Sequence, residues 1–531
     1  MTQPPSLFQR RIVIGAGLCV MAFALVGVRL VDVALFKLGH DAAKHSDRVE
    51  FARADLVDRN GALMARNLPA SDLYVRPHMF GDKRRAAHAL AAATGTDEVR
   101  LAQMFASKRP YVLVARQLPQ AARDQVAHLG LSGIDFEPNT KRYYPDGRMT
   151  SLVLGVTDPD GKGVSGLELG LDPRLHADRA GSVVETSLDM RVQFILAHEA
   201  AASMAMFQAR AAGGLVMDIR TGEIIALVSL PDFDPNARSF DGDDSTRNMV
   251  AQDIYELGSV FKIFSFALAL EDHTVRLDEQ LPIGNGFKIG KFTIHEAEHM
   301  PATLTVRDVL AQSSNIGTAQ IALRSGPDRQ RAFLARMGLL EAVKSELPET
   351  ARPLYPSHWG TVETATIGFG HGISVSPLAF AAAAAAVVNG GRRIQPTFLK
   401  HAGDARGEQL ISPETSAGMR DLLRYVVTNG TGKKADVAGY DVGGKTGSAE
   451  KVGPHGKYTH KLVTSFCGVF PIEAPRYLVF VVLDEPHGTK ATSGFALAGY
   501  TAAPLAGHVI SRIAPLLGVP MKPVTVAKEN S

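Results

Sequence analysis

The apolar run from Ile263 to Leu270 constrains the fold more than any other feature of the sequence. Read as a helix, the run is apolar on every face (Ile263, Phe264, Phe266, Ala267, Leu268, Ala269, Leu270). Such a helix is stable only when other elements enclose it, so the chain must build a core around it. The 531 residues, of which 45% are apolar, suffice for this core and predict about two to four domains. Fibrous and disordered classes are therefore excluded.

The charge balance and the cysteine content narrow the range of functions. Lysine and arginine number 57, aspartate and glutamate number 54, and the formal net charge is only +3. Domains that bind nucleic acid usually carry a strong basic patch, so we expect no nucleic-acid partner. The two cysteines, Cys19 and Cys467, are too few and too widely separated for a disulfide framework.

An uncharged apolar stretch near the N-terminus predicts a membrane anchor. It runs from Ile12 to Val28 and reaches Phe36 when two intervening charges are included. That is about the 20 residues a spanning helix needs. We expect a transmembrane anchor over residues 12–36, a cytoplasmic tail over 1–11 and an exported C-terminal portion. Basic residues flank both sides, so orientation rests on the tendency of long segments to translocate regardless of charge. A cleaved signal peptide and a buried core helix are the alternatives.

The remaining chain divides into two expected domains and a tail. Residues 37–184 mix strand-like pieces with turn-rich stretches and show no pattern of catalytic residues. Residues 185–518 form the second domain, and residues 519–531 a flexible tail. Helical spacing runs from Leu188 to Arg210, and the alanine-rich helix from Leu378 to Val388 stops at Asn389-Gly390-Gly391.

The second domain is expected to contain one antiparallel sheet. An early hairpin and three late segments supply its strands, and an apolar helix follows from Ala502 to Leu516. The expected strands are Leu215–Ile219, Glu223–Leu230, Val442–Ala449, Leu462–Phe470 and Tyr477–Leu483. The sequence thus predicts an α+β fold, with a mostly helical half between the early and late strands.

Ser259-Val260-Phe261-Lys262 is the first candidate for chemistry. Serine and lysine three residues apart share one helix face. Gly258 allows a sharp turn into the helix, which would place Ser259 at its N-terminus, where backbone N–H groups favour negative charge. Lowering a lysine pKa from about 10.4 to about 7 takes roughly 4–5 kcal/mol of burial and neighbouring positive charge. Taken alone, the pattern is equally compatible with a surface lysine on a helix.

Two further motifs strengthen that candidate. Lys445-Thr446-Gly447-Ser448 lies in the first late strand and supplies a second cation, although alone it is compatible with a strand end or turn. Ser313-Ser314-Asn315 lies between two helical stretches and alone is an N-cap or an inter-helix turn. In this order, Ser-x-x-Lys, Ser-x-Asn and Lys-Thr-Gly form the motif set of serine β-lactamases and penicillin-binding acyltransferases.

From Arg53 to about Leu517 the sequence resembles the class B penicillin-binding proteins, and most of all their cell-division transpeptidases. Further motifs carry the resemblance: Tyr255–Ser259, Gly368–Gly370, Ser374–Leu378, Gly430-Thr431-Gly432, Ser465–Gly468, Asp484-Glu485-Pro486, and upstream Asp58–Gly61, Arg142–Pro145 and Gly163–Glu168. Three positions depart from the family pattern: Leu257 replaces a proline, Ser448 stands where threonine is commoner, and Arg53-Ala54 replaces Arg-Gly. None of them removes a functional group that the chemistry needs.

The resemblance implies a fold and a set of site residues. The fold is a membrane-anchored mixed α/β pedestal of the dimerisation type, followed by a transpeptidase domain with a five-stranded antiparallel sheet and a helical subdomain. The implied roles are catalytic for Ser259, Lys262, Ser313, Asn315 and Lys445, substrate binding for Thr446, Gly447 and Ser448, and an oxyanion hole at the backbone N–H groups of Ser259 and Ser448.

The resemblance also implies a reaction and its partners. The enzyme would cross-link peptidoglycan stem peptides ending in D-Ala-D-Ala during septal wall synthesis, through an acyl-serine that β-lactams also form. No metal or organic cofactor is implied. The expected partners are the inner membrane, an FtsW-type glycosyltransferase and other division proteins, with the catalytic domain on the periplasmic, extracytoplasmic side. A β-lactamase, a D,D-carboxypeptidase or a non-catalytic penicillin sensor of the same fold would share the motifs.

His295-Glu296-Ala297-Glu298-His299 offers an unrelated hypothesis, a membrane-anchored zinc protease. In that pattern two histidines four apart on a helix hold the metal and the glutamate acts as base. Here Phe292-Thr293-Ile294 favours a strand just before it, and Pro301 follows closely, so a helix of useful length does not fit. The segment is better interpreted as a polar loop near the active site, and no metal ligand is assigned.

Overall fold

The computed structural model describes residues 53–523, except for 178–181, 238–243, 402, 405–406 and 454–456, together with residue 17 and a helix over 20–27. The chain forms two units: the first contains Asn67–Lys141, and the second contains Asp55–Arg66, Arg142–Ala177 and the chain from Val183 onward. The expected anchor over 12–36 lies outside the described residues, apart from residue 17 and the helix over 20–27. Among the described residues, no helix is both long and apolar enough to cross a membrane.

The first unit packs three helices on strands. Its helices are α3 (Lys83–Thr94), α4 (Glu98–Ala106) and α5 (Gln120–His128), and its strands are β3 (Val112–Leu118), the distal part of β2 (Leu63–Val75) and most of β4 (Ile134–Tyr143). Asp82 and Asp97 cap α3 and α4 by accepting hydrogen bonds from backbone N–H groups of the first turns. Buried residues such as Leu90, Phe105 and Val114 form the core.

A buried ion pair organises the upstream segments of the second unit. These segments comprise β1 (Asp55–Val57), β5 (Val183–Glu185), α6 (Ser151–Leu154), α7 (Gly166–Gly170) and α8 (Asp172–Ala177), and β1 pairs with β5 in parallel. Arg142 Nε donates to Glu168 Oε1 at 2.7 Å, and both side chains are almost fully buried. The upstream motif that begins at Arg142 and the one that ends at Glu168 are therefore in direct contact.

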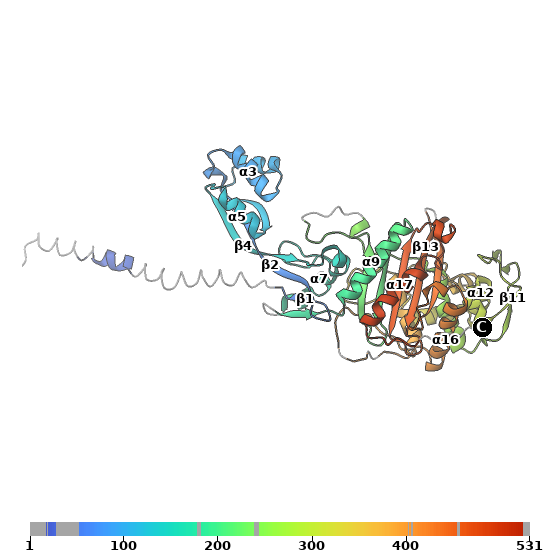
Figure 1. The fold of residues 1–531 in the computed structure, drawn as a ribbon. Helices are drawn as coiled ribbons and strands as arrows, with labels where there is room; N and C mark the ends of the chain where they lie inside the picture. Colours follow the sequence, from blue (N-terminus) through green and yellow to red (C-terminus); the bar gives the residue numbers. More distant parts are fainter. Residues whose placement is uncertain are drawn as a thin grey trace, which may run out of the picture. The chain divides into compact units, whose positions relative to one another are not determined.

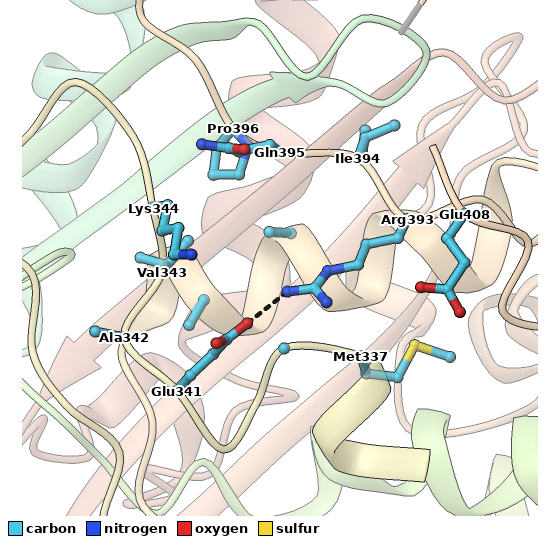
Figure 2. A pocket seen from close by; sticks show the side chains of 13 residues that line it. Met337, Glu341, Ala342, Val343, Lys344, Arg393, Ile394, Gln395, Pro396 and Glu408 are labelled. Carbon is cyan, nitrogen blue, oxygen red and sulfur yellow. Dashed lines mark hydrogen bonds and ion pairs between the residues drawn. The ribbon is translucent and has the colours of Figure 1, made fainter. Parts of the chain in front are cut away.

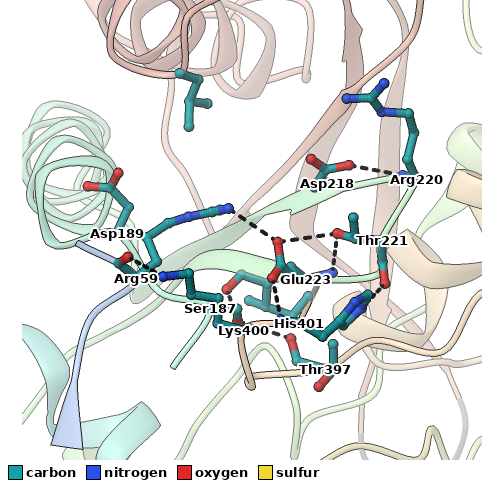
Figure 3. Close-up of polar contacts among 12 residues, drawn as sticks. Arg59, Ser187, Asp189, Asp218, Arg220, Thr221, Glu223, Thr397, Lys400 and His401 are labelled. Atoms are coloured by element: carbon teal, nitrogen blue, oxygen red, sulfur yellow. Dashed lines mark hydrogen bonds and ion pairs between the residues drawn. The ribbon is translucent and has the colours of Figure 1, made fainter. Parts of the chain in front are cut away.

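Glu223 binds another upstream motif of this unit, the Asp58–Gly61 turn. Its carboxylate accepts hydrogen bonds from Arg59 Nη2 at 3.3 Å and from the His401 backbone N–H at 3.0 Å. Figure 3 shows this carboxylate between Arg59, Thr221 and His401. Lys400 Nζ in turn donates to the Arg59 carbonyl at 3.1 Å. The Asp58–Gly61 turn is thus held by charges on segments far away in sequence.

The second unit is built on one five-stranded antiparallel sheet in the order β12-β13-β14-β6-β7. Its strands are β6 (Ala211–Asp218), β7 (Ile224–Leu230), β12 (Gly443–Val452), β13 (Tyr458–Phe470) and β14 (Tyr477–Asp484). The predicted sheet of two early and three late strands is confirmed. The β12–β13 hairpin extends beyond the predicted segments, because its polar end pairs through the backbone, with Glu450 opposite Leu462 and Val452 opposite Tyr458.

Helices cover the two faces of this sheet. Helices α9 (Met190–Met206) and α17 (Ala502–Leu516) pack on one face, as Figure 1 shows, against alternate strand residues such as Val479 and Val481. Phe480 lies between those two and points to the opposite face. There it contacts Phe380 of α15 (Pro377–Val388), at 5.1 Å between ring centroids.

The apolar run that constrained the fold forms α10 (Lys262–Glu271), which is enclosed as predicted. Phe261, just before α10, and Phe264 within it both contact the Phe380 ring. The helical half also contains α11 (Val306–Ala311), α12 (Asn315–Ser325), α13 (Pro327–Arg336), α14 (Thr361–Gly368) and α16 (Pro413–Asn429). Two small two-stranded antiparallel sheets accompany these helices: β8 (Gln280–Pro282) with β11 (Thr303–Thr305), and the hairpin of β9 (Phe287–Ile289) with β10 (Phe292–Ile294).

Candidate active site

Ser259 stands at the entrance to α10 because Gly258 permits the turn. Gly258 has φ +58°, a conformation that favours glycine, and begins a one-turn 3-10 helix, η6 (Gly258–Phe261). A Cβ at Gly258 would lie 2.6 Å from the Ser448 carbonyl oxygen, so a side chain there would push β12 away. The predicted sharp turn is confirmed, and it brings Gly258, the residue before Ser259, close to the backbone of Ser448.

Lys262 is fully buried one turn after Ser259, at the start of α10. Its Nζ donates to the Ser313 carbonyl, to Ser313 Oγ at 3.2 Å and to Asn315 Oδ1 at 2.8 Å. Burial, and then the positive charge of Lys445, lower the pKa of Lys262 well below its usual value, while the Glu296 charge raises it. The lowered pKa makes the neutral form, in which an amine can accept a proton, more accessible than in a solvent-exposed lysine.

The Ser313-Ser314-Asn315 motif forms the turn between α11 and α12. Ser313 has φ +62°, an uncommon conformation for a residue with a side chain. Ser314 is the N-cap of α12, as one predicted alternative had it, and its Oγ accepts the Gly317 N–H at 2.9 Å. This turn directs Ser313 Oγ and Asn315 Oδ1 towards Lys262.

Lys445 reaches the same hydroxyl from the sheet. Its Nζ donates to Ser313 Oγ at 2.9 Å and to the carbonyl of Thr446 at 3.1 Å. Lys445 is fully buried, and burial lowers its pKa to about 7. The two lysines thus contact one serine hydroxyl in a site that disfavours positive charge, an arrangement suited to moving a proton.

The rest of the Lys445–Ser448 motif lies along the edge strand β12. Thr446 Oγ1 and Thr431 Oγ1 are 2.7 Å apart, while Ser448 Oγ accepts the Ala498 N–H at 3.0 Å. A Cβ at Gly447 would lie 2.4 Å from the Leu257 carbonyl oxygen. Glycine at this position therefore lets the strand pack directly on the turn that precedes Ser259.

A cavity of about 360 Å³ joins these elements. Among the predicted site residues, Ser259, Ser313, Asn315, Thr446 and Ser448 line it. Lys262 and Lys445 lie buried behind it and reach it through Ser313. The structure thus gathers all three motifs around one cavity, although they are spread over 190 residues of sequence.

Several residues outside the predicted set also line this cavity. They include Glu296, Glu298, Phe369, His371, Thr431, Lys433, Lys434 and Tyr500. Burial, and then the charge of Lys262, lower the pKa of His371 to about 4, so its ring is neutral at pH 7. Thr431 had a sequence signal in its flanking glycines, whereas the position of His371 follows only from the packing of its ring on Phe369 and Tyr458.

The segment from His295 to His299 is a loop, as predicted, with β10 directly before it. Both histidines are exposed, and only Glu296 is half-buried. Within the described part of the chain, no group of three histidine, cysteine, aspartate or glutamate residues could hold a metal ion. The zinc-protease pattern therefore has no matching geometry among these residues.

A second cavity, of about 350 Å³, lies elsewhere in the second unit (Figure 2). Arg393 and Glu341 form an ion pair of 2.7 Å in its lining, and Met337 and Ile394 supply apolar surface. None of the three motifs contributes to this lining.

Comparison with protein-family models gives two matches. The model of the penicillin-binding protein transpeptidase domain matches residues 212–506, which include all three motifs. The model of the penicillin-binding protein dimerisation domain matches residues 48–193.

Individual relatives agree with these matches. The probable peptidoglycan D,D-transpeptidase FtsI of Caulobacter vibrioides is 38% identical over 526 residues, covering 96% of this chain and 89% of the relative. The probable peptidoglycan D,D-transpeptidase PenA of Neisseria meningitidis is 32% identical over 511 residues, covering 90% and 86%. A crystal structure of penicillin-binding protein 3 from Mycobacterium tuberculosis with aztreonam has a TM-score of 0.70 and 26% identity, covering 90% of this chain and 98% of that one.

Proposed function

This chain belongs to the class B penicillin-binding proteins, and we propose that it is a peptidoglycan D,D-transpeptidase acting through an acyl-serine at Ser259. The contact of Lys262 and Lys445 with one hydroxyl, that of Ser313, carries the proposal. Burying two lysines lowers the stability of the fold, and such groups are found most often at functional sites. The contact with Ser313 connects both lysines to the cavity that contains Ser259.

In the first step, Lys262 accepts the proton of Ser259 Oγ, which attacks the penultimate D-Ala carbonyl. A bond forms between Oγ and the carbonyl carbon, and the peptide bond to the terminal D-Ala breaks. The proton passes from Lys262 through the Ser313 hydroxyl to the leaving amine. Lys445 donates a hydrogen bond to the same hydroxyl. Backbone N–H groups of Ser259 and Ser448 stabilise the oxyanion, a contribution of about 10²–10³ in rate per donor.

In the second step, the amine of a neighbouring stem peptide attacks the acyl-enzyme. The ester bond to Ser259 breaks, a new amide forms, and the proton released by the amine returns to Ser259 Oγ. Before acylation, Asn315 binds the donor amide, while Thr446, Gly447 and Ser448 bind the terminal D-Ala and its carboxylate, which leave in the first step. A β-lactam resembles the D-Ala-D-Ala end, so it acylates the same serine and leaves slowly.

The proposal extends to location and partners. The apolar stretch over 12–36 supports a single-pass anchor in the inner membrane, with the catalytic domain at the extracytoplasmic side of the division septum. We propose the domain bounds 37–184 for the pedestal and 185–518 for the transpeptidase domain. An FtsW-type glycosyltransferase that supplies uncross-linked glycan, together with other division proteins, completes the proposed assembly.

The test is covalent labelling of the full-length protein in detergent with a fluorescent penicillin, followed by intact mass and peptide mapping. A lasting adduct on Ser259 is expected, and Ser259→Ala should remove it. Ser511→Ala, which removes an exposed serine of α17, should label like the wild type. Stoichiometric labelling of Ser259→Ala would refute the assignment.

A second measurement separates the possible fates of the acyl-enzyme. With a stem pentapeptide donor and an amine acceptor, mass spectrometry should detect the cross-linked product along with released D-Ala. Release of D-Ala without cross-linking would indicate a carboxypeptidase, and rapid drug hydrolysis a β-lactamase. A protein that binds penicillin but releases no D-Ala would be a sensor.

A further inference from the structure

Glu296 has contacts that the proposed mechanism does not yet use. Its carboxylate accepts hydrogen bonds from Ser314 Oγ, from the Asn315 N–H at 2.8 Å and from the Ile316 N–H at 3.0 Å. Glu296 lies on the loop between β10 and β11 and also lines the catalytic cavity. A single carboxylate thus binds the turn that carries two predicted catalytic residues.

These contacts place a negative charge at the N-terminus of α12. The first N–H groups of a helix have no partners within the helix, and an anion there complements the helix dipole. Ser313, at the start of the same turn, keeps φ +62°. A residue holds such a conformation only when its surroundings fix it, and Glu296 is part of those surroundings.

The charges around Lys262 come from several elements. Lys445 on β12 faces it as a cation and Glu296 as an acid, while His371, after α14, has a neutral ring at pH 7. Ser313 and Asn315 contribute the hydrogen-bond acceptors. Glu296 is therefore joined to Lys262 in two ways, through the turn it holds and through its charge.

We propose that Glu296 is a positioning residue of the acylation site, which fixes the Ser313–Asn315 turn and places one negative charge beside the two buried lysines. This inference rests on the proposed function, because it assigns a role in the acylation of Ser259. It gives Glu296, the first of two glutamates in the His295–His299 loop, a role in which no metal takes part.

A matched control exists because Glu346 makes similar contacts away from the catalytic cavity. Its carboxylate accepts hydrogen bonds from Thr397 Oγ1 at 2.7 Å and from the Phe398 N–H at 2.8 Å. Glu346→Gln and Glu296→Gln therefore remove the same charge from the same kinds of donors. Only the second change lies beside Lys262.

The test measures the second-order rate of penicillin acylation of the full-length protein from about pH 5 to about pH 9. Glu296→Gln should lower the plateau rate about ten- to a hundredfold, because the turn loses its fixed position. The acid limb, the part of the pH profile in which the rate rises with pH, should move to lower pH in this variant. The reason is that loss of the negative charge lowers the pKa of Lys262 further. Glu296→Asp should leave the limb near its wild-type position, and Glu346→Gln should match the wild type in both respects.

The outcomes separate this inference from the proposed function. Wild-type protein that fails to label would overturn both. If the wild type labels, an unchanged rate and limb in Glu296→Gln would overturn the positioning role, as would a lowered Tm with no change in acylation. Should Glu296→Gln not fold, Glu296→Asp decides: its shorter side chain should lower the rate at an unchanged limb, and a wild-type rate would refute the inference.

Discussion

The Nζ of Lys445 lies 2.9 Å from Oγ of Ser313, although 132 residues separate them in sequence. The same oxygen lies 3.2 Å from Nζ of Lys262. Two ammonium groups this close in a buried site repel each other, and each also pays for its loss of hydration. The pair therefore loses a proton more readily than two lysines exposed to solvent.

Replacing Lys445 by methionine should change the pH dependence of stability. In the folded protein the pKa of Lys445 is about 7, whereas an unfolded lysine titrates near ~10.4. Between these values the unfolded chain binds the extra proton, so wild-type stability should rise with pH. Lys445→Met removes this destabilising contribution, so its Tm should exceed the wild-type Tm most at and below about pH 7, with the difference shrinking as the pH rises towards about 9.

The same variant should acylate Ser259 about a hundredfold more slowly, because the relay through Ser313 loses its cation. Lys288→Met, which changes an exposed lysine of β9, is the control and should give a Tm curve parallel to that of the wild type. Calorimetry across the pH range provides the measurement. A Lys445→Met curve that also ran parallel to the wild type would contradict the proposed burial of charge.

Gly447→Ala should loosen the contact between β12 and the turn that precedes Ser259. The new Cβ would lie 2.4 Å from the Leu257 carbonyl and 2.7 Å from Ser465 Oγ. We expect a loss of about 1–3 kcal/mol in stability, as for other overpacked sites, together with slower acylation. Thermal unfolding and penicillin labelling measure the two effects.

Gly418→Ala is the matched control for that variant. Gly418 lies within α16, and a Cβ there would meet only Leu270 Cδ1, at 3.8 Å. Because glycine weakens a helix interior, this change should stabilise the protein by about 0.5–1 kcal/mol and leave labelling unchanged. Equal effects of the two substitutions would show that the close approach at Gly447 has no consequence.

Glu168→Gln should destabilise the second unit strongly, because it leaves the buried guanidinium of Arg142 without its carboxylate. Breaking a buried ion pair typically costs about 3–5 kcal/mol. The double variant Arg142→Met with Glu168→Met should lose less, since it leaves no uncompensated charge. Chemical unfolding of both variants tests this, and a double variant less stable than Glu168→Gln would contradict it.

Local patterns predicted the sheet and the helices that cover it. The apolar residues of α17 recur at helical spacing, whereas β14 and α10 are continuous apolar runs, and both kinds of pattern depend only on neighbouring residues. The polar end of the β12–β13 hairpin was missed, because its stability comes from backbone pairing rather than from apolar side chains. Conversely, the glycine before Ser259 marked its turn correctly, since a positive φ is a local property.

For the active site, the residue types and their order could be read along the chain: Ser259 with Lys262, the Ser313–Asn315 turn, and Lys445 with its glycine. Their order and spacing sufficed to indicate the family. Three contacts could be found only in the folded molecule: both lysines with Ser313, Thr431 with Thr446, and Glu296 with the start of α12. Such contacts join residues from different elements. The pKa values of the two lysines depend on burial, which is a property of the whole fold.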